Sequence, residues 1–225
     1  MKHWITAGAF AIAAIGGAAL FGGQTLFPPA MAQEAEPESE ATPEAAPEDI
    51  EITEMKIGPD DAPVKITEYA SFTCPHCANF HKGPFKQLKA DYLDNGEGQV
   101  QFIYRDVYFD KFGLWAAAVA RCGGEEKFFG ISGMLYEQQK DWIGSGDPVE
   151  IAENLRKIGK VAGLEDDQLD ACMADESKFK ALVAWFGENA ERDQIDSTPT
   201  LLINGEKHGN MNYEDLKELI EKELN

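Results

Sequence analysis

The sequence predicts an α/β fold that contains an inserted all-helical segment, and three observations lead to this prediction. A helical pattern lies between two apolar runs at residues 64–72 and 99–107, which is typical of two parallel strands joined by a right-handed crossover. Residues 112–175 then have helical spacing throughout, without a strand pattern. A helix, a strand, a hairpin and a last helix follow in residues 177–224, which completes an α/β sandwich.

The N-terminus, residues 1–32, is expected to be a secretory signal peptide. Lys2 and His3 precede an apolar run at residues 5–21, and Ala30-Met31-Ala32 matches the A-x-A pattern of a cleavage site. The alternative is an uncleaved membrane anchor, because the apolar run is close to the minimum spanning length of about 17 residues. Both alternatives predict export, and disulfides persist in exported proteins.

Residues 33–53 are expected to be a disordered acidic linker, because Glu, Ala and Pro dominate this stretch and leave little apolar surface to bury. The formal net charge of the chain is −20, and the sequence has no run of Lys and Arg. This charge argues against nucleic-acid binding through a basic face.

The sequence Cys74-Pro75-His76-Cys77 is the candidate redox centre. Two thiols separated by two residues can close a disulfide with little backbone movement and exchange it with the thiol of another protein. We expect Cys74 to be the N-cap of a helix that begins at Pro75, where the missing N–H of proline costs nothing. Free backbone N–H groups, the helix dipole and a protonated His76 would then stabilise a Cys74 thiolate. Such a thiolate is a good leaving group, so the disulfide should be easily reduced and should oxidise other thiols.

Glu68 places a carboxylate on the otherwise apolar face of the strand that precedes this motif. In one interpretation, a bulge or the strand end returns Glu68 to solvent. In the other, Glu68 is a partly buried acid that exchanges protons with Cys77.

The helix after the motif is predicted to run from Pro75 to about Leu93, with a kink where Pro84 frees a backbone carbonyl. His81 is expected to be a solvated residue of this helix. A zinc module is the alternative from another functional class, because Cys74, Cys77 and His81 have ligand-like spacing. A structural zinc site normally needs four ligands, however, and the sequence has no second Cys/His cluster nearby.

Cys122 and Cys172 both lie in the helical segment. If they are paired, they close a loop of about 50 residues and stabilise the fold by roughly 4 kcal/mol in the chain-entropy model. The alternative is two free buried thiols. Their wide spacing argues against a second redox motif.

The C-terminal part contains a strand after Pro199 that ends in Asn204-Gly205, a strong hairpin signal. The last helix should be capped by Asn212. On sequence alone, the bond between Thr198 and Pro199 is only a weak candidate for a cis peptide.

These motifs together resemble the DsbA-type thiol:disulfide oxidoreductases, which have a thioredoxin-like fold with an inserted helical domain. The Cys-Pro-His-Cys sequence is identical to the family's active-site motif, and Glu68 is at the position of the family's buried acid. Thr198-Pro199 is at the position of a cis-proline loop that faces the active site and pairs with substrate. The spacing of Cys122 and Cys172 resembles that of alphaproteobacterial members.

The resemblance extends over about residues 54–224. It implies that residues 54–111 and 176–225 form the thioredoxin-like domain and that residues 112–175 form the helical insertion.

The resemblance also implies a function. A substrate thiolate attacks Cys74 in the Cys74–Cys77 disulfide, Cys77 leaves, and a second substrate thiolate resolves the mixed disulfide. This chemistry requires no metal and no organic cofactor. The expected partners are reduced substrate proteins of the periplasm and a quinone-linked membrane reoxidase of the DsbB type. A monomer is expected, because residues 33–53 are too short to form a dimerisation domain.

Thr198 supports a second redox interpretation. Many oxidases of the family have Val before the cis-proline, whereas Thr is found in its isomerase branch. A disulfide isomerase or reductase of the same fold is therefore the alternative to an oxidase.

Overall fold

The structure, a computed structural model, describes residues 50–225. The predicted signal peptide and residues 33–49 of the predicted linker lie outside the described part. Residues 50–53 have no regular secondary structure, and the carbonyl of Thr53 accepts a hydrogen bond of 2.9 Å from Nη1 of Arg121.

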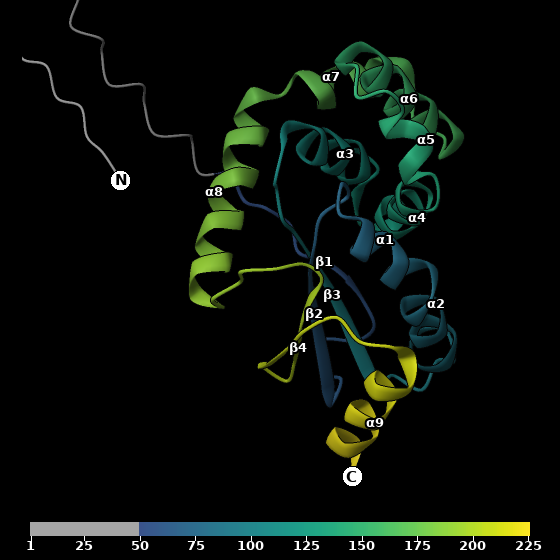
Figure 1. Cartoon of the computed structure of the whole chain (residues 1–225), viewed down its shortest axis with the longest axis vertical. Coiled ribbons are helices and arrows are strands. Elements are labelled where there is room, and N and C mark those ends of the chain that lie inside the picture. The colour runs from purple at the N-terminus through teal and green to yellow at the C-terminus, as the bar shows by residue number, and fades with distance from the viewer. Residues whose placement is uncertain (1–49) are drawn as a thin grey trace, which may run out of the picture. The chain divides into compact units, whose positions relative to one another are not determined.

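A five-stranded mixed sheet lies at the centre of the molecule (Figure 1). Its spatial order is β1-β3-β2-β4-β5. Strands β2 and β3 are parallel, with Val64 opposite Val100, and the other neighbours are antiparallel. The strands are β1 (Met55–Ile57), β2 (Val64–Ala70), β3 (Val100–Asp106), β4 (Thr200–Ile203) and β5 (Glu206–His208).

Helices cover both faces of the sheet, and successive residues of β2 point to opposite faces. Glu68 contacts His81 of α1 (Pro75–Lys82), whereas the Tyr69 hydroxyl donates to the carbonyl of Asn189 in α8 (Glu176–Arg192). In Figure 1, α8 lies on one side of the sheet, and α1 lies on the other side with α2. The further helices near α1 are α2 (Pro84–Leu88), the π-helix η1 (Lys89–Leu93) and α9 (Tyr213–Leu224).

The segment between β3 and α8, which was predicted to contain no strand, forms five helices at one end of the sheet (Figure 1). Asp110 caps the first of them through Oδ1, which accepts from the N–H groups of Phe112 and Gly113 at 2.8 and 2.9 Å. One continuous core joins these helices to the sheet, so the insertion does not form a separate core. The five helices are α3 (Lys111–Cys122), α4 (Gly124–Glu137), α5 (Gln139–Ile143), α6 (Pro148–Val161) and α7 (Asp166–Ala174).

The prediction of one kinked helix over residues 75–93 is wrong. The first helix ends at Gly83, whose N–H donates to the carbonyls of Asn79 and Phe80 at 3.1 and 3.3 Å. Pro84 then begins α2 at position N1, and a π-helical turn follows. Proline cannot donate the hydrogen bond that would continue the helix, so the chain breaks there instead of bending.

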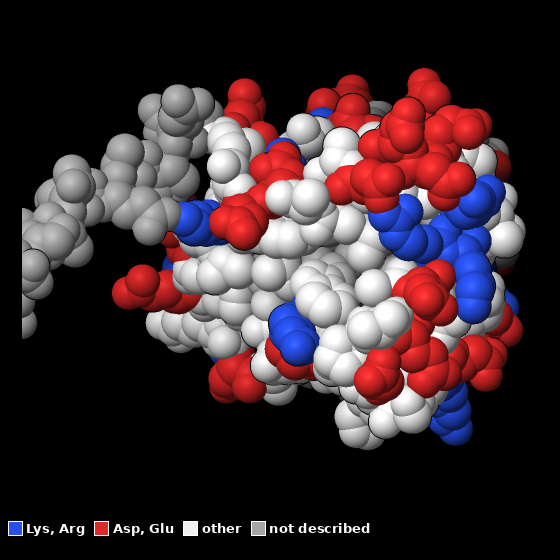
Figure 2. Space-filling view, turned by 90° about the horizontal axis from the view of Figure 1, so that it is seen from above, with Lys and Arg blue, Asp and Glu red and all other residues white. Residues whose placement is uncertain are grey.

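Acidic side chains dominate the surface of the helical end. Figure 2 looks onto this end and shows Asp and Glu gathered over much of its rim, with smaller groups of Lys and Arg between them. An uncharged area lies at the centre of the same face. Within residues 50–225, we find no helix with the length and apolar character needed to cross a membrane.

Candidate redox site

Cys74 occupies the N-cap of α1, with extended backbone angles, and Pro75 is the first residue of the helix. Cys74 is 8% exposed, whereas Cys77 is fully buried. Neither cysteine is in a disulfide, so the site is in its dithiol form. The side chain of His76 is exposed beside them.

The two thiols differ strongly in acidity. A hydrogen bond from the Cys77 thiol is the largest cause that lowers the pKa of Cys74 to about 5, and it outweighs the opposing effect of burial. Hydrogen bonding with Thr198 and with the backbone of Cys77 and His76 lowers this pKa further. The pKa of Cys77 is raised far above its ordinary value, first by burial, then by the Cys74 sulfur and by the charge of Glu68. At neutral pH the site therefore holds one thiolate, on the accessible sulfur.

Thr198 and Pro199 lie against this thiolate, although they are more than 120 residues away in the sequence. The peptide bond between them is cis. The Cys74 sulfur lies 3.6 Å from the carbonyl oxygen of Thr198, to which the thiol can donate when it is protonated. The fold thus brings together the two segments that the resemblance assigned to one site.

Glu68 is completely buried, so the interpretation that returned it to solvent is wrong. Its Oε2 lies 2.7 Å from Nε2 of His81, and the pair shares a hydrogen bond. The expectation that His81 is solvated is also wrong, because this residue is only 5% exposed. The face of α1 that carries His81 packs on β2, and the helical pattern alone did not reveal this contact.

His81 also packs among aromatic rings. Its imidazole is stacked on the ring of Tyr136 with the ring centres 4.1 Å apart, and the ring of Phe85 lies 4.6 Å away. The hydroxyl groups of Tyr104 and Tyr136 are hydrogen-bonded to each other at 2.6 Å. The alternative of a zinc site would need His81 as its third ligand, but Nε2 of His81 is hydrogen-bonded to Glu68. Among residues 50–225, no group of three His, Cys, Asp or Glu side chains could hold a metal ion.

Gln139 is a site residue that the sequence analysis missed. It is buried in α5, and its Nε2 donates to the carbonyls of Phe72 and Cys74 at 2.8 and 2.9 Å. The helical insertion thereby holds the segment that leads into the redox motif. Gln139 lies between Gln138 and Lys140, so no local pattern in the sequence distinguished it.

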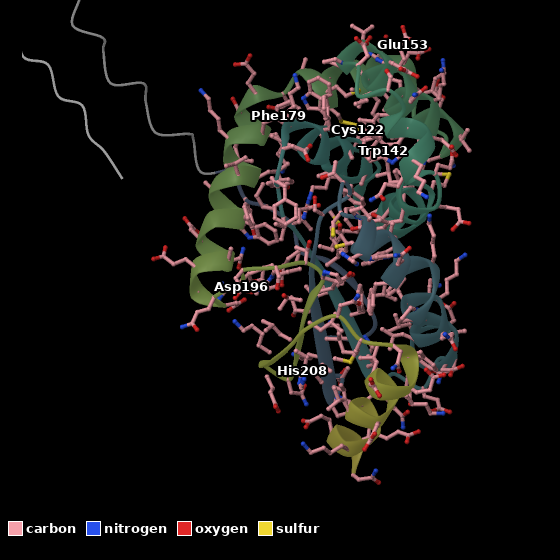
Figure 3. The ribbon with its side chains drawn as sticks, in the orientation of Figure 1. Cys122, Trp142, Glu153, Phe179, Asp196 and His208 are labelled. Atoms are coloured by element: carbon pink, nitrogen blue, oxygen red, sulfur yellow. A yellow bond between two sulfur atoms is a disulfide. The ribbon has the colours of Figure 1, made fainter. Side chains whose placement is uncertain are left out.

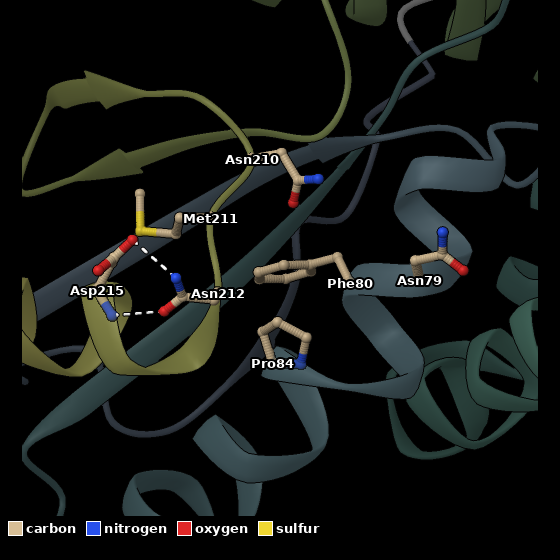
Figure 4. A pocket seen from close by; sticks show the side chains of 7 residues that line it. All are labelled: Asn79, Phe80, Pro84, Asn210, Met211, Asn212 and Asp215. Carbon is tan, nitrogen blue, oxygen red and sulfur yellow. Dashed lines mark hydrogen bonds between the residues drawn. The ribbon is translucent and has the colours of Figure 1, made fainter.

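A surface pocket lies next to the redox helix (Figure 4). One wall comes from the junction of α1 and α2, and the other comes from the segment before α9, where Asn212 is hydrogen-bonded to Asp215. The wall residues are Asn79, Phe80, Pro84, Asn210, Met211, Asn212 and Asp215.

Cys122 and Cys172 form a disulfide between α3 and α7, with their Cα atoms 5.9 Å apart. Cys122 is labelled in Figure 3, where a disulfide appears as a yellow bond in the helical end of the molecule. The four cysteines therefore divide into a free pair at the end of β2 and a bonded pair in the insertion.

The comparisons with known proteins agree with this geometry. The family model described as thioredoxin matches residues 51–222. The chain belongs to the thioredoxin family. Within the family it is similar to a putative protein-disulfide oxidoreductase of Rickettsia conorii, with 28% identity over 176 residues, which cover 78% of this chain and 62% of the relative. The chain thus spans less than two thirds of that relative's length.

A second relative matches over more of its length. The disulfide bond formation protein D of Bacillus subtilis is 29% identical over 177 residues, which cover 75% of this chain and 76% of the relative.

Solved structures show the same architecture. Alpha-DsbA1 of Wolbachia pipientis superposes with a TM-score of 0.69 at 25% identity, over 75% of this chain and 89% of that one. Oxidised BdbD of Bacillus subtilis superposes with a TM-score of 0.66 at 25% identity, over 76% and 92% of the two chains. The predicted thioredoxin-like fold with a helical insertion is confirmed.

Proposed function

We propose that this protein is an exported thiol:disulfide oxidoreductase that donates the Cys74–Cys77 disulfide to reduced proteins. The observation that carries the proposal is the difference between the two thiols, one accessible with a pKa of about 5 and the other buried with a raised pKa. Both relatives described above bear names of disulfide-forming proteins, which supports the same function.

The reaction begins when a substrate thiolate attacks Cys74, the less buried residue of the pair. The bond between Cys74 and Cys77 breaks, and its electron pair goes to the Cys77 sulfur. A second substrate thiolate then attacks the substrate sulfur of the mixed disulfide, and Cys74 leaves as a thiolate. Because this leaving group has a low pKa, the second step favours release of the oxidised substrate.

The segment at Thr198 and Pro199 would guide the substrate. A backbone segment beside a reactive sulfur can pair with an extended peptide, as an added strand pairs with a sheet edge. His76 and Pro75 belong to the same exposed surface around Cys74. We assign substrate binding to Thr198 and Pro199, and we assign stabilisation of the thiolate to His76 and the start of α1.

The proposed setting is the periplasm, reached through the signal peptide at residues 1–32. The partners are reduced substrate proteins and a quinone-linked membrane reoxidase of the DsbB type, and the protein acts as a monomer. The disulfide between Cys122 and Cys172 has a structural role and does not take part in exchange.

An isomerase or reductase remains the second candidate, and Thr198 is the residue that favours it. Its Oγ1 is buried, and its interaction with the Cys74 sulfur lowers the pKa of Cys74. A hydroxyl there offers a polar contact to a bound thiolate or peptide, which Val could not make.

A glutathione redox titration of the purified protein tests the function. Free thiols are trapped by alkylation, and each cysteine is read by mass spectrometry. We expect Cys74 and Cys77 to remain reduced until the buffer is strongly oxidising, while Cys122 and Cys172 stay bonded. A Cys74–Cys77 disulfide that persists in reducing buffers would instead identify a reductase.

A further inference from the structure

The Glu68–His81 pair lies between the buried thiol and a second pocket of the molecule. Oε2 of Glu68 is bonded to His81, whereas Oε1 is buried and has no hydrogen-bond partner within residues 50–225. The charge of Glu68 acts on Cys77. The imidazole of His81 is bonded to Glu68 and also lines the second pocket.

This pocket is separate from the one shown in Figure 4. It has a volume of about 190 Å³ and lies between the helices α1 and α2 and the helix α4. That is room for several water molecules, each of which occupies roughly 30 Å³. Its apolar walls include Phe85 and Phe129, and its charged residues are Lys82, Lys86, Lys89 and Glu137.

Strands β2 and β3 and helix α4 each place an ionisable residue near His81, whereas α2 places the apolar ring of Phe85 against it. Strand β2 contributes Glu68, whose charge raises the pKa of Cys77 in α1. The rings of Tyr104 and Tyr136 lie with their centres 5.9 and 4.1 Å from that of the imidazole, and burial raises the pKa values of both hydroxyl groups well above the ordinary range. The imidazole is therefore the group through which a proton can pass between Glu68 and the pocket.

We propose that His81 is a positioning residue for disulfide exchange, which orients Glu68 and carries protons between this pocket and the Glu68 carboxyl group next to Cys77. The proposal rests on the proposed function, because it concerns the step in which Cys77 leaves Cys74. It assigns a role to a histidine that lies outside the Cys-Pro-His-Cys motif.

The protons and electrons of the step balance. When the substrate thiolate bonds to Cys74, the electron pair of the broken bond makes Cys77 a thiolate. This thiolate would be buried beside the Glu68 carboxylate, so it takes a proton from the Glu68–His81 pair and becomes a thiol. Water in the pocket then returns a proton to His81. Over the whole reaction, the substrate loses two protons, Cys77 keeps one, and one is released, since Cys74 remains a thiolate.

Without a proton donor, the first step would place two negative charges in a buried site, which is costly because burial penalises charge. A positioned acid that supplies the proton typically contributes a factor of about 10²–10⁴ to a rate. His81 acts through Glu68 and is not the direct proton donor, so we expect its removal to cost about tenfold, which is less than the loss of the donor itself.

The test compares the purified protein with the His81→Gln variant, which keeps a hydrogen-bond donor for Glu68 and cannot carry a positive charge. The oxidised protein is mixed with a dithiol peptide, the reaction is quenched with acid, and the mixed disulfide at Cys74 is counted by mass spectrometry between pH 5 and 9. Rates are corrected for the thiolate fraction of the peptide. We expect His81→Gln to react about tenfold more slowly at neutral pH and to lose the inflection that the imidazole gives to the pH profile.

His208→Gln is the matched control. His208 belongs to β5 at the edge of the sheet and is labelled in Figure 3. The same substitution there should leave the rate and the profile unchanged. Glu68→Gln should slow the same step, and the double variant should be no slower than the slower single variant, because the two residues act as one unit.

A uniformly slower reaction with an unchanged pH profile would give His81 a purely structural role and overturn the proposal. A measurement on the unaltered protein does not depend on the folding of a variant. Nitrogen-15 chemical shifts of the His81 imidazole at neutral pH should differ between the oxidised and reduced protein, and identical shifts would also overturn it. If the unaltered protein transfers no disulfide to the peptide at all, the proposed function fails instead.

Discussion

At the scale of single residues, the site is defined by the unequal environments of two identical side chains. Cys74 and Cys77 are three positions apart, yet one is at the open start of α1 and the other faces the core. A hydrogen bond from Cys77 stabilises the charged form of Cys74, and the same contact disfavours a charge on Cys77. The chemistry of the pair therefore depends on their mutual contact as much as on the helix dipole.

Replacement of Cys77 by Ala should raise the pKa of Cys74. We expect a rise of about one to two pH units, because a hydrogen bond to a charged group contributes roughly 1.5–3 kcal/mol and one pH unit corresponds to about 1.4 kcal/mol. The thiolate absorbance at 240 nm, measured across a pH titration, gives this midpoint. Cys77→Ser is the control, since its hydroxyl can replace the donor and should keep the pKa lower than Ala does. Equal midpoints in Cys77→Ala and the unaltered protein would contradict the assignment.

The slope of the redox potential of the Cys74–Cys77 pair against pH should change near pH 5. Below the pKa of Cys74, reduction takes up two protons, and above it only one, because Cys77 stays protonated while Cys74 does not. The potential should therefore fall with rising pH by about 59 mV per unit below pH 5 and by about 30 mV per unit above it, for a two-electron couple. Redox titrations in buffers between pH 4 and 8 measure both slopes. A single slope of about 59 mV per unit across this range would show that Cys74 has no lowered pKa.

At the scale of elements, short breaks decide which residues reach the site. The interruption at Gly83 and Pro84 ends α1 at Lys82, so that His81 lies in its last turn against β2. A close contact between two backbone segments also constrains the sheet. Gly58, which follows β1, has a φ of +96°, and a Cβ added there would lie 2.3 Å from the carbonyl oxygen of Val100.

Gly58→Ala should therefore destabilise the protein. A left-handed backbone conformation and a contact with rigid backbone both oppose the added methyl group, which predicts a loss of about 1–3 kcal/mol in the free energy of unfolding. Urea unfolding at neutral pH measures the loss. Gly209→Ala is the matched control, because a Cβ there meets nothing within 4 Å. A loss at Gly58 no larger than at Gly209 would contradict the prediction.

At the scale of the whole molecule, the helical insertion is tied to the sheet by polar bonds as well as by the shared core. Gln139 holds the carbonyls of Phe72 and Cys74, and Arg121 forms a buried ion pair of 2.7 Å with Asp106 at the end of β3. The disulfide then joins two helices within the insertion. The part of the molecule that supports the redox site is thus stabilised at several separate points.

Removal of this disulfide should weaken the fold without abolishing exchange. The Cys122→Ala/Cys172→Ala variant opens a loop with a sequence separation of 50 residues. We expect a loss of about 4 kcal/mol in the free energy of unfolding from the chain-entropy model. Urea unfolding of the oxidised protein gives the loss, and the peptide assay should show exchange at Cys74 close to the unaltered rate. Loss of exchange in a folded variant would give these cysteines a redox role.

The sequence by itself determined the local features of this protein. The redox motif, the proline at the start of α1, the βαβ unit and the hairpin at Asn204-Gly205 depend on neighbouring residues, so they could be predicted without a structure. The resemblance added the cis bond before Pro199, which local preference alone disfavours.

Only the tertiary structure decided which side chains surround the thiols. Whether His81 meets water or Glu68 depends on how α1 packs on β2 and α4, and Gln139 reaches Cys74 from a helix 65 residues away in the sequence. Helical periodicity shows that a face is apolar but not which partner covers it. The partner determines burial, and burial determines the acidity of Cys77 and the path of its proton.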